Sequence, residues 1–169
     1  MVLELKGFFN GGNRELKIET ELDFSGEEYG GEYIFTTPVL VSGKISNKAD
    51  VTHIDLICKV QIEKSCDRCG TKAVKQFEVN INRVAVNHLE GEEDDEFLLI
   101  PDEKLDLYEF CFGEVLLSLP MKHLCSENCK GICLSCGKNL NTGSCGCVTK
   151  SIDPRLEVLA KLLEQDQED

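Results

Sequence analysis

Residues 54–81, IDLICKVQIEKSCDRCGTKAVKQFEVNI, hold two alternating segments separated by a short connection that carries two cysteines. Apolar side chains fall at every second position from Ile54 to Ile62, and again from Phe77 to Ile81. This period is typical of a half-buried β-strand, because successive side chains of a strand point to opposite faces of the sheet. The intervening SCDRCGT predicts a tight hairpin connection between two antiparallel strands.

Further strands are expected on both sides of this hairpin. Apolar and charged residues alternate through residues 15–24, and apolar residues recur in phase in residues 39–45. The sequence FLLIP at residues 97–101 predicts a last short strand. After residue 81 the apolar phase slips, which predicts a bulge near residues 82–83, because an extra residue turns the following side chains to the other face.

Two helices are expected in the C-terminal half of the chain. Asp106 has the character of an N-cap, apolar residues recur from there at helical spacing as far as Leu119, and Pro120 ends the element. The sequence DPRLEVLAKLLEQ predicts a second helix, with Asp153 as its N-cap and Pro154 in its first position. Its leucines recur at helical spacing and form an apolar stripe.

The order of these elements predicts an α+β fold. It consists of an antiparallel β-sheet or barrel-like N-terminal half, a helix, a zinc-knuckle segment and a C-terminal helix. We expect residues 1–89 to carry the sheet and the CDRC hairpin, residues 90–104 to form an acidic connector, and residues 105–169 to hold the helices and the cysteine-rich segment. A chain of 169 residues is the size of one integrated domain. The acidic run Glu90–Glu96 is expected to be a solvated loop.

Composition and charge limit the kinds of protein that this chain can be. A net charge of −13 disfavours broad, unaided binding to nucleic acid, because such binding needs a basic surface that displaces counterions. The chain has no apolar run of the roughly 20 residues that a membrane span requires. Its first residues show no basic segment followed by an apolar one, so no secretory signal is expected. We therefore expect a cytoplasmic protein with reduced thiols and no membrane partner.

Six of the ten cysteines gather in residues 124–147, LCSENCKGICLSCGKNLNTGSCGC. A C-x-x-C pair is followed there by a C-x-C pair, and four thiolates at this spacing complete the tetrahedral shell that zinc prefers. The glycine that follows the C-x-x-C pair tolerates the positive φ of the tight turn. The first expected zinc site therefore consists of Cys133, Cys136, Cys145 and Cys147.

Two further cysteine pairs predict a second zinc site, formed by Cys66, Cys69, Cys125 and Cys129. It would bridge the hairpin to the C-terminal cysteine segment. Closing the chain of about 56 residues between the pairs costs roughly 3–4 kcal/mol, whereas structural zinc contributes about 10–16 kcal/mol. Nothing in the spacing demands the bridge, so a protein with one zinc that takes Cys125 or Cys129 into the first site is an alternative.

Other roles are open to some of the cysteines and histidines. Cys58 and Cys111 fall in phase with apolar faces, so we expect them in the core. Disulfides are disfavoured by the expected cytoplasmic setting. A redox role for the pair at Cys66 is also disfavoured, because catalytic C-x-x-C pairs usually open a helix and this one lies between strands. His123 could replace a thiol as a ligand, although a histidine at such a place is more often merely exposed.

The sequence contains no arrangement typical of an enzyme active site. We find no Ser/His/Asp arrangement, no phosphate-binding loop, no dinucleotide-binding glycine motif and no paired carboxylates in a defined context. We therefore expect a protein without enzymatic activity and without a small-molecule substrate.

Several distinctive segments follow one another along the chain: the CDRC hairpin, an acidic stretch, the helix that ends in Leu-Pro, the run C-x3-C-K-G-x-C-x-x-C-G-x-N-L-N, and DPRL. Together they resemble the YceD family of bacterial proteins, also known as the DUF177 domain. The resemblance covers residues 35–163. Gly70 stands where the family often has leucine and Leu134 where it often has proline, and neither difference removes a thiol.

The resemblance implies a role in ribosome biogenesis. The family is linked to the accumulation of 23S ribosomal RNA, through its synthesis, processing or stability, and its gene often neighbours that of a large-subunit zinc-ribbon ribosomal protein. We therefore expect a non-enzymatic factor with one or two structural Zn²⁺ ions. Its expected partners are a large-subunit precursor, 23S ribosomal RNA, a basic ribosomal protein, or a combination of these. The alternative is a thiol redox or zinc-handling protein that uses CDRC.

Basic side chains flank the cysteine pairs of this acidic chain. A bridging zinc would gather them into one patch, where they would either contact RNA or another partner, or neutralise the thiolates. The sequence favours these two roles about equally. The residues concerned are Lys64, Arg68, Lys72, Lys122, Lys130 and Lys138.

Overall fold

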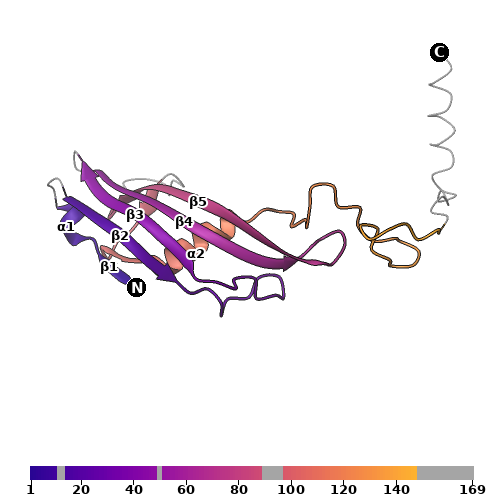
Figure 1. Cartoon of the computed structure of the whole chain (residues 1–169). Helices are drawn as coiled ribbons and strands as arrows, with labels where there is room; N and C mark the ends of the chain where they lie inside the picture. Colours follow the sequence, from indigo (N-terminus) through magenta and orange to yellow (C-terminus); the bar gives the residue numbers. More distant parts are fainter. Residues whose placement is uncertain (11–13, 49–50, 89–96, 148–169) are drawn as a thin grey trace, which may run out of the picture.

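A five-stranded sheet dominates the computed structural model, which describes residues 1–10, 14–48, 51–88 and 97–147 (Figure 1). In spatial order its strands are β2 (Arg14–Leu22), β3 (Val39–Lys48), β4 (Val51–Ser65), β5 (Lys72–Val86) and β6 (Phe97–Leu99). Two further strands, β1 (Val2–Glu4) and β7 (Lys104–Asp106), pair with each other. The helices are α1 (Lys6–Phe9) and α2 (Leu107–Leu117).

The described residues form a mixed α+β fold with few helices, as the sequence predicted. Neighbouring strands from β2 to β5 are antiparallel, in agreement with the alternating segments, whereas β6 pairs with β5 in the parallel direction. The short elements β1, β7 and α1 were not predicted, because a segment of three or four residues is too short to show a periodic pattern. The run Glu90–Glu96 and the helix expected after Asp153 lie outside the described residues.

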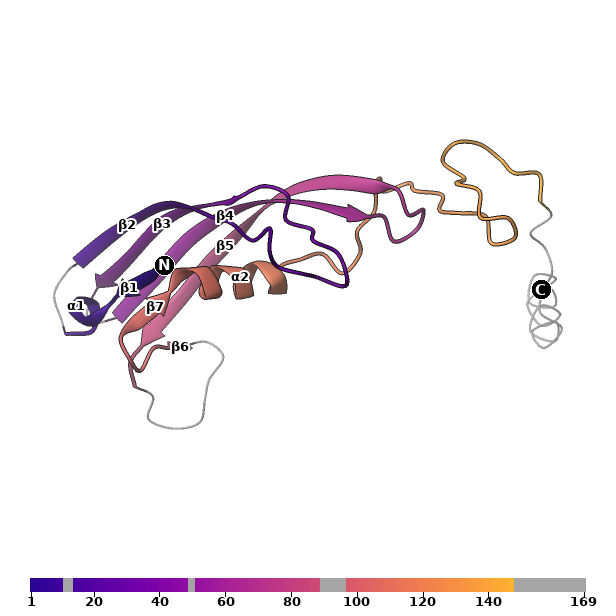
Figure 2. The same cartoon turned by 90° about the horizontal axis from the view of Figure 1, so that it is seen from below.

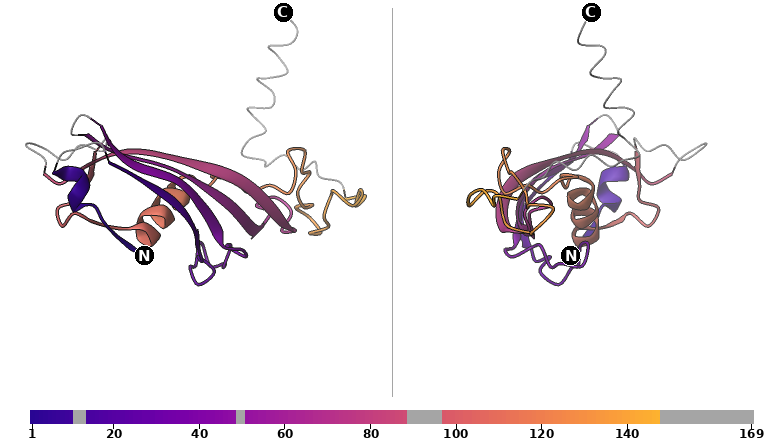
Figure 3. Two further views of the ribbon diagram at one scale, coloured as in Figure 1. Left: turned by 60° about the vertical axis from the view of Figure 1, so that its left-hand side comes forward. Right: turned by 90° about the vertical axis from the view of Figure 1, so that its right-hand side faces the viewer.

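The main sheet curves around helix α2, which lies against its concave face (Figures 2 and 3). Phe24 is fully buried at the centre of this contact. Its ring centroid lies 5.6 Å from that of Phe35, 5.0 Å from that of Tyr108 and 5.2 Å from that of Phe112, all edge to face. Each such pair contributes about 0.5–1.5 kcal/mol beyond the burial of its surface, so this aromatic cluster holds the helix to the connection between β2 and β3.

Helix α2 begins where its N-cap was predicted and ends slightly earlier than expected. The Asp106 carboxylate accepts a hydrogen bond from Tyr108 N at 2.9 Å and so satisfies one of the free N–H groups of the first turn. The helix ends at Leu117, and the backbone N of Ser118 still donates to Glu114 O at 3.2 Å. Within the part of the chain that the structure describes, no helix is long and apolar enough to cross a membrane.

The bulge predicted near residues 82–83 does not occur. The register of β4 against β5 is continuous, with Ile54 opposite Arg83 and Leu56 opposite Ile81. Arg83 therefore takes an inward position in the alternation, where its Nε and Nη2 donate to the Glu114 carboxylate of α2 at 2.8 and 3.2 Å. The prediction was wrong because it expected an apolar residue at this inward position. Arg83 is accepted there because its guanidinium pairs with Glu114 of the helix.

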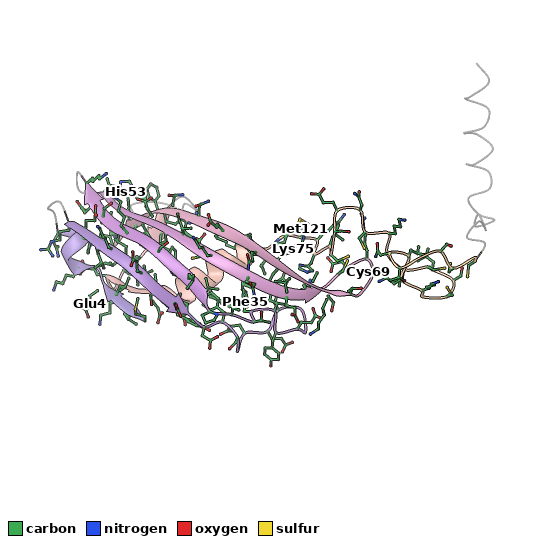
Figure 4. The ribbon with its side chains drawn as sticks, viewed as in Figure 1. Glu4, Phe35, His53, Cys69, Lys75 and Met121 are labelled. Atoms are coloured by element: carbon green, nitrogen blue, oxygen red, sulfur yellow. The ribbon has the colours of Figure 1, made fainter. Side chains whose placement is uncertain are left out.

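Strands β4 and β5 extend beyond their neighbours toward the cysteine segment (Figure 4). The pairing of β3 with β4 ends at Lys59, whereas β5 pairs with β4 as far as Ser65. A bridge between Phe35 and Ile62 supports the extension from one side. The projecting hairpin carries Cys69 at its tip, so Cys66 and Cys69 stand with Cys129 at one end of the sheet, outside the main core (Figure 4).

Candidate metal centres

The loop between β4 and β5 is a tight turn that brings its two thiols together. Cys66 N donates to Thr71 O at 2.9 Å, and Gly70 N donates to Cys66 O at 2.8 Å. Gly70 has a φ of +70°, which glycine adopts without the strain that a Cβ would cause. The hairpin connection predicted from SCDRCGT is confirmed.

The chain that follows helix α2 returns to this loop and is clamped to it. Asp67 N donates to His123 O at 2.9 Å, while the Asp67 carboxylate accepts from His123 N at 2.7 Å. The His123 ring lies with Nε2 3.0 Å from Ala73 O on strand β5. These three contacts position the chain just before Cys125.

Four thiols from the two segments meet at the clamp and form what we call the inner cluster: Cys66, Cys69, Cys125 and Cys129. Their Sγ atoms all lie within 4.8 Å of one another. The separation is 3.8 Å for Cys66 and Cys129 and 3.6 Å for Cys69 and Cys125. Cys125 is exposed, and the other three are buried. The structure thus brings the thiols of the hairpin and of the C-terminal segment together in the set that was predicted for the second site.

The thiols of the inner cluster differ in their tendency to ionise. Burial raises the pKa of Cys66, but the backbone N–H groups of Cys125, Arg68 and Cys69 outweigh burial and bring this pKa down to about 6. The pKa of Cys125 is raised to about 12, first by its contact with Cys129 and then by Cys69. Neighbouring thiolates repel one another, so the cluster ionises completely only around a cation.

The second set of four, which we call the outer cluster, consists of Cys133, Cys136, Cys145 and Cys147. Its C-x-x-C-G loop repeats the hydrogen bonds of the hairpin loop: Cys133 N donates to Lys138 O, and Gly137 N to Cys133 O, both at 2.8 Å. Gly137 has a φ of +72°, close to that of Gly70. Two loops far apart in the sequence therefore hold their thiols by one backbone arrangement.

The outer cluster, like the inner one, contains one thiol with a lowered pKa and one with a raised pKa. The backbone N–H of Cys136, with that of Ser135, lowers the pKa of Cys133 to about 6. Contact with the Cys136 side chain raises the pKa of Cys147 to about 12. In each cluster the first cysteine of the C-x-x-C-G loop is thus the thiol most ready to become a ligand.

The sulfur spacing of the inner cluster fits a tetrahedral thiolate site, and the sulfurs of the outer cluster also lie within 4.8 Å of one another. Four sulfurs at about 2.3 Å from one zinc ion lie about 3.8 Å from each other, close to the 3.6 and 3.8 Å of the inner cluster. All ten cysteines are free, and these separations exceed the roughly 2.05 Å of a disulfide bond. Each set of four could therefore hold a metal ion.

The remaining cysteines and His123 lie outside both clusters. Cys58 on β4 and Cys111 on α2 are fully buried, as expected for core residues. His123 is neither a member of a cluster nor exposed: it is 2% exposed, and its Nδ1 has no hydrogen-bond partner among the described residues. The hydrogen bonds between His123 and Asp67 could not be predicted from the sequence, because the two residues lie 56 positions apart and no local pattern links them.

The predicted basic residues surround the clusters, but most already have partners. Lys64 pairs with Asp67 at 3.8 Å, and Lys72 pairs with Glu63 at 3.3 Å.

Two more donate to backbone oxygens beside the clusters. Arg68 Nη1 donates to Cys129 O at 3.0 Å, and Lys138 Nζ donates to Ser144 O at 2.9 Å. Of the six predicted basic residues, which all lie within the described ranges, only Lys122 and Lys130 are exposed with no hydrogen bond or ion pair to the side-chain nitrogen. The structure therefore gathers these residues at one end without leaving a broad set of unpaired cations.

A curved, mostly antiparallel sheet with two four-cysteine clusters at one end defines an α+β protein with two candidate metal centres. Residues 54–163 match the family described as "Large ribosomal RNA subunit accumulation protein YceD". The chain belongs to this family, and the resemblance seen in its motifs is confirmed.

Relatives of the chain occur in bacteria and plants. It is 30% identical over 134 residues to "Uncharacterized protein YlbN" of Bacillus subtilis (strain 168), and 78% of each chain is covered. It is 26% identical over 148 residues to the chloroplastic "Large ribosomal RNA subunit accumulation protein YCED homolog 1" of Zea mays, with 69% of this chain covered. The Arabidopsis thaliana protein of the same name is 27% identical over 167 residues, with 81% covered. The chain spans about half the length of these plant proteins, 50% and 52%. No solved structure matches.

Proposed function

We propose that this chain is a non-enzymatic factor that supports the accumulation of large-subunit ribosomal RNA and carries two structural Zn²⁺ ions. The names of its family and of its two plant relatives support the ribosomal role. The observation that carries the proposal for the metal is the meeting of two sets of four thiols at the projecting end of the sheet.

Zinc suits both clusters better than other common ions. Thiolates are soft ligands, and four of them in a tetrahedral arrangement select zinc, whereas magnesium and calcium prefer oxygen. Four protein ligands leave no open position for a substrate or an activated water, so such a site is structural. Zinc binding of about 10–16 kcal/mol exceeds the roughly 3–4 kcal/mol needed to close the chain between the hairpin and Cys125.

The charge near the clusters favours a partner other than naked RNA. Residues 63–72 and 121–147 carry six basic and three acidic side chains, a formal surplus of three positive charges. Two four-thiolate zinc sites carry about four negative charges, which cancel that surplus. Phosphate binding needs a net positive potential, so we propose an adaptor that recognises a basic ribosomal protein or a preformed large-subunit precursor and binds isolated 23S ribosomal RNA weakly.

Salt titrations on naked 23S ribosomal RNA and on large-subunit precursor particles, run side by side, test this proposal. We expect tighter binding to the particles, and for naked RNA a weak affinity whose salt slope has a magnitude below about five. The control variant replaces Lys122 and Lys130, the two exposed basic residues beside the clusters whose side chains have no partner among the described residues, by glutamate. It should change binding to particles little. Equal, tight binding of the unaltered protein to both targets would contradict the proposal.

A second candidate function is thiol redox chemistry or zinc handling at Cys66 and Cys69. The pKa of about 6 at Cys66 favours it, because a thiolate is the reactive form of cysteine. Metal content per chain, measured beside the free-thiol count of freshly reduced protein, separates the two functions. Stoichiometric zinc with few reactive thiols supports the assembly factor, and reversible oxidation of this pair supports the alternative. The cytoplasmic setting and the absence of a small-molecule substrate remain predictions.

A further inference from the structure

The two cysteine clusters are joined by the side chains of a short loop, Asn139–Leu140–Asn141. Asn141 Nδ2 lies 3.3 Å from Cys129 Sγ, so a residue of the outer loop donates a hydrogen bond to a sulfur of the inner cluster. On the same loop Asn139 Nδ2 donates to Thr71 Oγ1 at 3.1 Å, beside the hairpin loop. Leu140 N donates to Gly131 O at 2.9 Å. The outer loop is therefore bonded to both segments that supply the inner thiols.

Backbone groups determine which atom of each asparagine amide faces which partner. Lys130 N can only donate, so the Asn141 atom at 2.8 Å from it must be Oδ1. That leaves Asn141 Nδ2, with its two hydrogens, to donate both to Asn139 Oδ1 at 2.9 Å and to Cys129 Sγ at 3.3 Å. In the same way Asn141 N donates to Asn139 Oδ1 at 2.9 Å, which leaves Asn139 Nδ2 for Thr71. The backbone N–H groups thus fix the orientation of both amides, and the N–H···S contact follows from that orientation.

The chain between the clusters is also packed against the hairpin loop. Arg68 donates from Nη1 to Cys129 O at 3.0 Å. Gly131, with a φ of +74°, lies so close to the hairpin that a Cβ on it would stand 3.2 Å from Arg68 O. A hydrogen bond and a close backbone approach therefore hold the segment from Cys129 to Cys133 against the CDRC loop.

We propose that Asn141 couples the two clusters, so that metal in the outer cluster strengthens the retention of metal by the inner one. This inference rests on the proposed binding of zinc. Cys136 and Cys145 bracket the loop, and a metal ion held by both fixes its ends. The fixed loop keeps the Asn141 N–H on Cys129 Sγ, where it stabilises the negative charge of a thiolate ligand. Loss of the outer metal frees the loop and removes this donor.

The test replaces Asn141 by aspartate and follows metal release from the full chain. Asn141→Asp keeps the oxygen that accepts from Lys130 N but sets a carboxylate oxygen against Cys129 Sγ. The matched control is Asn128→Asp, which adds the same charge at an exposed residue whose side chain makes no hydrogen bond among the described residues. Loading with Zn²⁺ or with Co²⁺, whose thiolate charge-transfer absorption reports sulfur ligation, followed by a chelator chase, gives one release phase per cluster.

We expect the inner phase to be about 10- to 100-fold faster in Asn141→Asp than in the control, which is the usual effect of removing a hydrogen bond to a metal ligand. Combination with Cys145→Ser tests the coupling itself. If the outer metal acts through Asn141, Cys145→Ser alone also accelerates the inner phase, and adding Asn141→Asp changes little more.

Additive effects of Cys145→Ser and Asn141→Asp, or an inner phase that is equal in Asn141→Asp and Asn128→Asp, would overturn the coupling. Either result leaves the proposed zinc sites intact, provided that the unaltered chain still binds two ions. Failure of the unaltered chain to bind stoichiometric metal would instead remove the zinc proposal and the coupling with it.

Discussion

Asp67 and His123 hold each other through two hydrogen bonds although 56 residues separate them in the sequence. One bond uses only the backbone, from Asp67 N to His123 O, and the other joins His123 N to the Asp67 carboxylate. Because Asp67 lies between Cys66 and Cys69, and His123 lies just before Cys125, this clamp brings the two halves of the inner cluster together.

Loss of one outer ligand should remove one metal ion and leave the other. We expect Cys133→Ser or Cys145→Ser to reduce zinc from two ions per chain to one and to disorder the outer cluster, because three thiolates do not complete a tetrahedral site. Elemental analysis of purified protein gives the count. Cys58→Ala, which removes a fully buried thiol outside both clusters, should keep both ions. Unchanged zinc in both serine variants would show that the outer assignment is wrong.

The inner cluster should control the order of a distant segment. We expect Cys66→Ser to accelerate amide hydrogen exchange in residues 121–131, because a metal shared with Cys125 and Cys129 would no longer hold that segment to the hairpin. Exchange measured by mass spectrometry on fragments of this region checks the prediction. Helix α2 serves as the internal reference, since its aromatic contacts with Phe24 and Phe35 lie outside both clusters. Exchange in residues 121–131 that equals that of the unaltered protein would argue against a bridging metal.

The pairing of Arg83 with Glu114 should contribute measurably to stability. Glu114 is only 18% exposed and accepts two hydrogen bonds from the guanidinium. We expect Glu114→Ala to lower the free energy of unfolding by about 1–3 kcal/mol, because it leaves a partly buried charge with fewer partners. The control is Glu78→Ala on the surface pair with Lys59, which should cost below about 1 kcal/mol. Equal losses in denaturant titrations would contradict this ranking.

Stability should fall at alkaline pH through the ionisation of Tyr108. Burial, together with the hydrogen bond to Glu27, raises the pKa of this phenol to about 12, compared with about 10 in an unfolded chain. A raised pKa means that the folded state favours the protonated form. The stabilisation that the protonated Tyr108 gives to the folded state is therefore complete below about pH 10 and is lost as the pH rises toward 12.

The variant Tyr108→Phe isolates this contribution from the other groups that ionise at high pH. It keeps the ring against Phe24 but removes the hydroxyl, and it should cost about 1 kcal/mol near neutral pH. The difference in unfolding free energy between the two proteins should shrink as the pH rises from about 10 to about 12. A difference that stays constant over this range would show that Tyr108 does not ionise as its surroundings imply.

Features with a short-range sequence signal could be predicted. The alternation around CDRC predicts the β4–β5 hairpin, because strand pairing across a tight turn involves neighbours in the chain. Asp106 marks the start of helix α2, because an N-cap acts within one turn. The grouping of Cys133 with Cys136, Cys145 and Cys147 also follows from spacing, since these thiols lie close in sequence and share one loop.

Features decided by distant contacts appear only in the tertiary structure. Counting thiols suggests that Cys66 and Cys69 share a site with Cys125 and Cys129. Only the tertiary structure shows the hydrogen bonds between Asp67 and His123 that hold the two segments side by side. Arg83 takes an inward position because Glu114 of a later helix meets it there, and β6 lies parallel to β5 although the local pattern says nothing about direction. The bond from Asn141 to Cys129 Sγ likewise depends on where two loops come to rest. Composition and spacing thus determine the strands and which cysteines are available as ligands, whereas packing and hydrogen bonds between remote residues decide which of them meet.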